Sequence, residues 1–108
     1  MSTVIQDGSN GIFRGVHDDV VIPDVPLTTA ILGSANRYAE KPALVDGFSG
    51  YRLTYRQLTD LVRHTAVGLT RRGFSKGDVL ALFSPNCPEF VVAFHAVASV
   101  GGIVTTIN

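Results

Sequence analysis

The chain has 108 residues, of which 45% are hydrophobic and 17% are charged, and nine basic side chains balance nine acidic ones. This length is enough for one small hydrophobic core. A charged fraction below the roughly 25% typical of soluble domains predicts that part of the apolar surface is covered by a neighbour. A formal charge of zero argues against a nucleic-acid partner or binding to an anionic membrane.

The single cysteine, Cys87, excludes an internal disulfide and the known zinc-binding cysteine patterns, which favours a reducing, cytoplasmic location. The first residues lack a basic region followed by an apolar core and include Asp7, so no signal peptide is predicted. The longest apolar run, residues 90–104, is interrupted by His95 and is shorter than the roughly 20 residues that a spanning helix needs. No transmembrane segment is predicted.

Residues 1–26 show no helical periodicity and are punctuated by glycines and prolines, so we expect an extended lead. Within it, Val20–Ile22 is a candidate edge strand that Pro23 keeps short. From Leu27 onward apolar residues recur at i, i+4, i+8 and i+11, which predicts one amphipathic helix that ends before Pro42. Its apolar stripe consists of Leu27, Ile31, Ala35 and Tyr38.

A β-hairpin is predicted next, because residues 43–46 and 51–54 flank a four-residue connection with glycine at both ends, Gly47 and Gly50. Both glycines are interpreted as turn residues, since positive φ is the common use of glycine. The sequence holds neither a Walker-type phosphate loop nor a strand followed by a dinucleotide-binding glycine pattern.

Thr54 and Gln57 form a capping-box pair ahead of a long amphipathic helix. Arg71 and Arg72 suit the negative end of that helix, and Gly73 suits the left-handed residue after it. The apolar face is expected to contain Leu58, Leu61, Val62, Ala66 and Leu69.

The last 32 residues are typical of a strand, a helix and a second strand. Val79–Phe83 is predicted to be a strand covered on both faces, and Ile103–Ile107 a β-branched strand. Between them Asn86 is the expected N-cap of a helix that Gly101-Gly102 ends. A crossover helix between two strands implies a parallel pair.

The expected fold class is therefore α/β, with a βαβ unit of parallel strands, a peripheral β-hairpin and two further helices in a three-layer arrangement. The expected domains are the lead, residues 1–26, and an α/β unit over residues 27–108.

Candidate reactive residues all have ordinary structural explanations. Cys87 lies near a helix start, where a thiolate would be stabilised, but no adjacent base is evident. His95 lies on an apolar helix and is interpreted as a core or interface histidine. His17 and His64 are expected at the surface, and the three histidines are too scattered to predict a metal site.

Two charged pairs are also explained without a ligand. Asp18 and Asp19 are neighbours in an extended segment, so their carboxylates point to opposite faces. The helix dipole accounts for Arg71 and Arg72. No catalytic, cofactor-binding or metal-binding residue is therefore assigned from the sequence.

The run from Lys76 to Asn108, KGDVLALFSPNCPEFVVAFHAVASVGGIVTTIN, resembles the early N-terminal part of the AMP-forming adenylating enzymes, which include acyl- and aryl-CoA ligases and luciferases. The pattern is most similar to 4-coumarate:CoA ligases and fatty acyl-CoA ligases. The segments KPALVDG, LTYRQL and GLTRRGFSKGD follow the family's order, so the resemblance covers roughly residues 20 to 108.

The resemblance implies a parent enzyme that converts a carboxylic acid and ATP to an acyl-adenylate, then transfers the acyl group to coenzyme A, with Mg²⁺ as the expected metal. It leaves open whether the acid is a hydroxycinnamate, a fatty acid or another acid. The family's phosphate loop, adenine motif, ribose aspartate and C-terminal lysine match no position here, so the ATP, Mg²⁺ and CoA sites are expected in the remainder of the parent ligase.

Two functions are consistent with these observations. The first is an N-terminal fragment of such a ligase, inactive alone. The second is a stand-alone α/β interaction or regulatory module that binds a partner through an exposed sheet edge.

Overall fold

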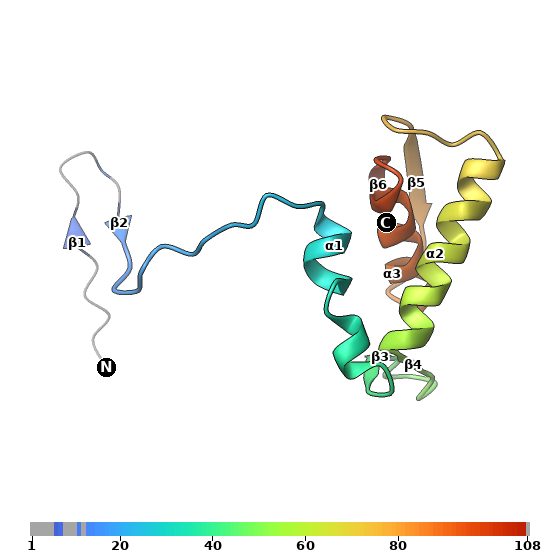
Figure 1. Ribbon diagram of the computed structural model, residues 1–108, viewed down its shortest axis with the longest axis horizontal. Helices are drawn as coiled ribbons and strands as arrows, with labels where there is room; N and C mark the ends of the chain where they lie inside the picture. The colour runs from blue at the N-terminus through green and yellow to red at the C-terminus, as the bar shows by residue number, and fades with distance from the viewer. Residues whose placement is uncertain (1–5, 8–10, 12, 108) are drawn as a thin grey trace.

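The structure is a computed structural model that describes residues 6–7, 11 and 13–107 (Figure 1). Residues 13–26 extend away from a body that begins at α1. In chain order the elements are β1 (Gln6–Asp7), β2 (Phe13–Arg14), α1 (Leu27–Leu32), the 3₁₀ helix η1 (Ala35–Tyr38), β3 (Pro42–Val45), β4 (Arg52–Thr54), α2 (Tyr55–Arg71), β5 (Val79–Phe83), α3 (Pro88–Ser99) and β6 (Ile103–Ile107).

The lead contains one short element pair that the sequence did not predict. β1 and β2 pair antiparallel, with Gln6 opposite Arg14. Residues 15–26 contain neither helix nor strand, as expected for an extended segment. The prediction of an edge strand at Val20–Ile22 is wrong, because no strand of the described chain pairs with these residues.

The predicted helix from Leu27 to Pro42 is two short helices. α1 ends at Leu32, where the N–H of Gly33 donates to the carbonyl of Thr29, and η1 begins three residues later, at Ala35. The break rotates the second half relative to the first, so the predicted apolar stripe is not continuous. Leu32 and Ala35 are buried, whereas Leu27, Ile31 and Tyr38 of the predicted stripe are about half exposed.

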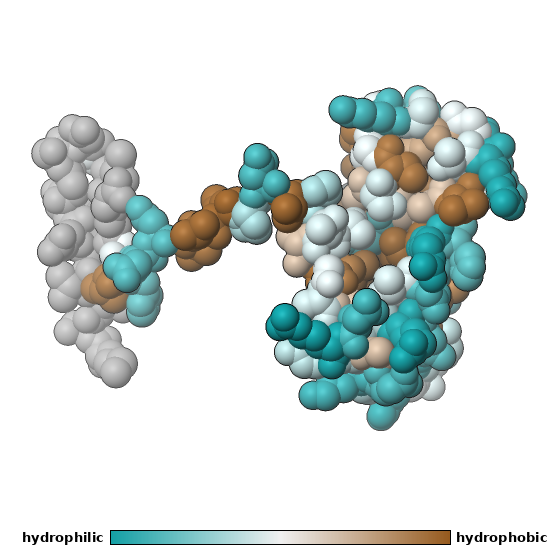
Figure 2. Space-filling view, viewed as in Figure 1, coloured by the Kyte–Doolittle hydropathy of each residue, from teal (hydrophilic) through white to brown (hydrophobic). Residues whose placement is uncertain are grey.

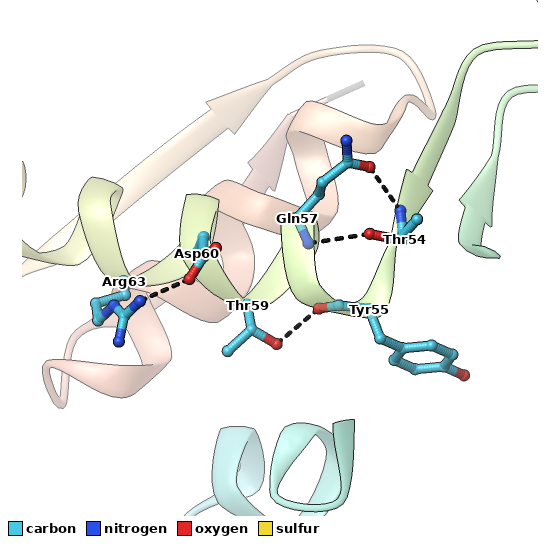
Figure 3. A network of polar contacts seen from close by, with 6 residues as sticks. All are labelled: Thr54, Tyr55, Gln57, Thr59, Asp60 and Arg63. Atoms are coloured by element: carbon cyan, nitrogen blue, oxygen red, sulfur yellow. Dashed lines mark hydrogen bonds and ion pairs between the residues drawn. The ribbon is translucent and has the colours of Figure 1, made fainter. Parts of the chain in front are cut away.

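The hairpin and the helix after it confirm the local sequence signals. β3 and β4 pair antiparallel, with a register shift between Pro42 and Leu44. At the start of α2 the N–H of Gln57 donates to Thr54 Oγ1 at 3.2 Å, and the N–H of Thr54 donates to Gln57 Oε1 at 2.9 Å (Figure 3). This reciprocal pair satisfies two N–H groups that the helix itself leaves open.

The end of α2 also follows the prediction. The helix ends at Arg71, Arg72 is the C-cap, and Gly73 has a φ of 92°. On the predicted apolar face, Leu58 and Val62 are buried, but Leu61 is 40% exposed.

The strand–helix–strand unit has the predicted order and pairing. β5 and β6 are parallel and in continuous register, from Val79 opposite Ile103 to Phe83 opposite Ile107. α3 ends before Gly101, whose φ is 75°. Gly102 is needed for close approach, because an added Cβ would lie 2.4 Å from the Phe74 ring. The close neighbours are side chains and not a second backbone.

The predicted cap of α3 is wrong. Cys87, not Asn86, is the N-cap residue, and it makes no side-chain capping bond. Pro88 occupies the first turn, where its missing N–H is one that the helix would leave unpaired anyway. Glu89 also lies in the first turn, where its charge suits the helix dipole.

α3 is the central element of the body, because it contacts α1, α2 and β6. Its residues Val92, Ala96 and Val97 are almost completely buried. The core lies where α1, α2, α3 and the hairpin meet, and the hairpin lies at one end (Figure 1). The buried residues of the core are Leu32, Leu53, Leu58, Val62 and Val92.

The layers are therefore the β5–β6 pair, then α3, then α1 and α2. The expectation that Val79–Phe83 is covered on both faces is wrong for this chain, because side chains alternate between exposed and half-buried along β5. Helices cover one face of the pair, and the other face is open.

Candidate functional site

The outer face of the β5–β6 pair is an apolar surface built by strand geometry. Side chains two residues apart point to the same face of a strand, and the parallel register places Val79, Ala81 and Phe83 beside Ile103, Thr105 and Ile107. All six residues are exposed. The four large side chains are 59%, 78%, 53% and 50% exposed at Val79, Phe83, Ile103 and Ile107. We call these six residues the outer sheet face.

A cluster of large exposed apolar residues that is contiguous on one face marks an interaction site more often than scattered ones do. The edges of the pair add main-chain groups, since β5 and β6 have no further strand partner among the described residues. The outer sheet face can therefore accept both side-chain packing and strand pairing.

A hollow of 390 Å³ lies at the carboxyl ends of the two strands. Ligands of open α/β sheets commonly bind beyond the carboxyl ends of parallel strands. Here the only side-chain hydroxyl of the lining, that of Ser84, donates to the carbonyl of Pro85 at 3.0 Å. The lining residues are Phe83, Ser84, Pro85, Asn86 and Ile107.

Cys87 follows this lining in the chain and lines a neighbouring hollow beside the hairpin. Its Sγ is 3.4 Å from Ser84 Oγ, and the residue is half-buried. A hydroxyl is no general base for a thiol, because it takes up a proton only in strong acid. The structure thus gives Cys87 a position at the start of α3 and a hydroxyl neighbour.

His95 ties α3 to α1. Its Nδ1 lies 3.1 Å from Thr28 Oγ1, and Thr28 Oγ1 donates to the carbonyl of His95 at 3.3 Å. Because a hydroxyl has one proton, donation to the carbonyl leaves Oγ1 to accept from Nδ1–H. Burial lowers the pKa of His95, since desolvation disfavours the charged ring. The interpretation as a core histidine is confirmed.

The remaining candidate residues are not brought together. His17, His64, Asp18 and Asp19 are exposed, as are Arg71 and Arg72 at the end of α2. Among residues 6–7, 11 and 13–107, no three side chains of His, Cys, Asp or Glu gather as metal ligands.

The glycines of the hairpin loop serve the turn, with one difference from the prediction. Gly50 has a φ of 73°, but Gly47 does not use positive φ. Asp46 organises the loop: its carboxylate accepts from the N–H groups of Phe48 and Ser49, at 3.2 and 3.3 Å, and from the Ser49 hydroxyl. The hydroxyl bond and the Phe48 N–H hold the pKa of Asp46 below its ordinary value.

Sequence reasoning missed Asp46 and Thr28. An Asp at the head of a four-residue turn is a recognised signal, because its side chain bonds backbone groups two and three residues on. Thr28 carried no signal, since its partner is 67 residues away.

No helix among the described residues is both long and apolar enough to cross a bilayer.

Comparisons with known proteins agree on one family. The sequence profile described as "AMP-binding enzyme" matches residues 32–108. The chain is 37% identical over 98 residues to 4-coumarate-CoA ligase CCL1 of Humulus lupulus, an alignment that covers 90% of this chain and 18% of the relative. 4-Coumarate-CoA ligase 4 of Arabidopsis thaliana is 37% identical over 102 residues, with the same coverage.

Solved structures agree. A fatty acyl CoA synthetase of Mycobacterium tuberculosis superposes with a TM-score of 0.68 at 32% identity, over 75% of this chain and 16% of that one. The N-terminal domain of FACL13 of the same organism gives a TM-score of 0.70 at 30% identity, over 78% and 21%.

The fold is that of a partial N-terminal subdomain of the adenylate-forming enzymes. The chain belongs to the AMP-binding enzyme family, and among its relatives are acyl- and aryl-CoA ligases. It spans about a fifth of the length of the curated relatives that it matches.

Proposed function

We propose that this chain is an N-terminal fragment of an ATP-dependent acyl- or aryl-CoA ligase and is catalytically inactive alone. The observation that carries the proposal is the outer sheet face: a family member that spans 18% of its relative leaves the apolar side of a parallel strand pair uncovered. The rest of such a ligase is the partner that would cover it.

The proposal divides the chain into a lead, residues 1–26, and an incomplete α/β unit, residues 27–108. ATP, Mg²⁺, CoA and the carboxylic acid belong to the rest of the ligase. This chain contributes a packed scaffold and a docking face. A cytoplasmic location is part of the proposal and is supported by the lone cysteine.

Pyrophosphate exchange tests inactivity directly. The 108-residue chain is incubated with Mg²⁺, ATP, labelled pyrophosphate and a panel of cinnamic and fatty acids, beside a full-length relative. We expect exchange at the level of the buffer blank, because adenylyl transfer needs cations or donors placed around the triphosphate. Acid-dependent exchange that a point mutation in this chain abolishes would overturn the proposal.

A solution measurement separates the fragment from the stand-alone interaction module. A fragment with an open sheet face is expected to bind a hydrophobic dye and self-associate, and Phe83→Asp should reduce both, because it places a charge on that face. The control Phe48→Asp changes a fully exposed phenylalanine in the hairpin loop. A dye-free monomer with a cooperative melt would favour the module.

A further inference from the structure

A second apolar surface lies on the other side of the body, between α1, α2 and the end of α3. It is a groove of 470 Å³. Figure 2 shows hydrophobic surface in the depression between α1 and α2. The groove is lined by Thr28, Leu32, Thr59, Val62, Arg63, Ala66, Val67, Thr70, Arg71, Ser99 and Val100.

The hydroxyl groups of the lining already have acceptors. Thr59 and Thr70 donate to carbonyls one turn earlier in α2, at 2.8 and 2.9 Å, and Ser99 donates within α3 at 2.7 Å. Thr28 donates to the carbonyl of His95. With these protons used, the threonine methyl groups remain to pack, so the groove suits an apolar occupant.

Two arginines stand beside this apolar lining. Arg63 is paired with Asp60 at 2.6 Å, as Figure 3 shows. Arg71, eight residues further along α2, has no ion-pair partner among the described residues. The occupant that complements the groove is therefore apolar in its centre and carries a carboxylate that reaches Arg71.

The lead has this composition. Val20, Val21 and Ile22 are 85%, 89% and 86% exposed, and Figure 2 shows the hydrophobic surface of the lead standing clear of the body. Asp18 and Asp24 flank them. Within the described residues neither carboxylate has an ion-pair partner.

The tether is long enough. Ile22 is six residues from Thr28, which lines the groove, and six extended residues span about 20 Å. The α2 side of the groove runs from Thr59 to Arg71, about 18 Å of helix.

α1 runs antiparallel to α3, because Leu32 belongs to the same core cluster as Val92 whereas Thr28 contacts His95. The first residues of α1 therefore lie toward the end of the groove that Ser99, Val100 and Arg71 line. Asp24 is four residues from Thr28, so it is the carboxylate that the tether places at this end.

We propose that the lead is a strap: Val20–Ile22 folds back into the groove between α1, α2 and α3, with Asp24 against Arg71. The structure shows the open form. Closing removes three exposed apolar side chains and the groove from water and pairs two charges. The strap does not depend on the outer sheet face or on the proposed function.

Disulfide trapping tests the strap. In a Cys87→Ser background, Val21→Cys is combined with Val67→Cys in the groove, and separately with Ser49→Cys in the hairpin loop as the control. We expect the groove pair to close as a monomer at least about tenfold faster than the control pair under dilute, mildly oxidising conditions, because docking raises the local thiol concentration. Equal rates, or dimers in place of closed monomers, would overturn the strap.

Charge reversal tests the register. Arg71→Glu and Asp24→Arg should each slow closure of the groove pair, and the double variant should restore it, because the pair of charges is then re-formed with opposite polarity. The control pair should close at one rate in all four backgrounds. A closure rate of the groove pair that does not change with these substitutions would overturn the assignment of Asp24 to Arg71.

Discussion

The inner core and the outer sheet face are both rich in apolar residues but differ in what covers them. Leu58, Val62 and Val92 are buried where three helices and the hairpin meet. Val79 and Phe83, on a strand just as rich in apolar residues, are more than half exposed. Apolar composition alone therefore does not predict which residues are buried, because burial also requires another element of the chain to cover them.

The largest loss of stability is expected for a substitution of a core leucine. Leu58→Ala should destabilise the chain by about 2–5 kcal/mol, because it leaves a cavity among packed side chains. Phe83→Ala should change the free energy of unfolding by less than about 0.5 kcal/mol, since its side chain is 78% exposed. Denaturant melts measure both. Similar losses would mean that the outer sheet face is buried in solution.

A smaller effect is expected where α3 meets β6. Gly102→Ala should cost about 1–3 kcal/mol, because the new methyl group would meet the Phe74 ring and a Val97 methyl within 3 Å. The control is Gly68→Ala inside α2, where an added Cβ meets nothing within 4 Å. That change should stabilise by about 0.5–1 kcal/mol, since alanine favours helix. Two effects of the same sign would contradict this packing.

The starts of α2 and α3 are expected to differ in the contribution of a capping side chain to stability. Thr54→Ala should cost about 1 kcal/mol, because an N–H of α2 loses its acceptor. Asn86→Ala should change stability by less than about 0.5 kcal/mol, since Asn86 is exposed and is not the cap. Thermal melts of the two variants check this. A larger loss for Asn86→Ala would restore the original capping prediction.

The smallest effect concerns pH. Burial lowers the pKa of His95 below the ordinary value of 6.5, so the unfolded chain binds a proton more readily than the folded one. This contribution to the free energy of unfolding is fully present above pH 6.5 and is lost as the pH falls from 6.5 toward the lowered pKa of His95. Unfolding titrations at about pH 8 and pH 5 should show a pH-dependent loss that His95→Gln reduces and His64→Gln, at an exposed position, preserves. An unchanged slope in His95→Gln would place the titrating group elsewhere.

The elements that could be predicted from the sequence are those formed by contacts between residues close together in the chain. The Thr54–Gln57 capping box, the four-residue hairpin loop and the glycine after α2 all lie where they were predicted. The parallel pairing followed from the crossover helix. The family followed from the segments that resemble adenylating enzymes, and the family profile confirms it over residues 32–108.

Which apolar residues are buried could not be predicted from the sequence, because it depends on tertiary contacts. Periodicity predicted that Leu27, Ile31 and Ala35 face inward, but of these only Ala35 is buried. Leu32, which lies outside the predicted stripe, is buried in place of Leu27 and Ile31. The contact between Thr28 and His95, 67 residues apart, left no local pattern. Caps and turns are formed by residues within about four positions of one another, so a local pattern predicts them. Burial depends on which distant element packs against a face. β5, for example, is packed against the rest of the chain on one face only.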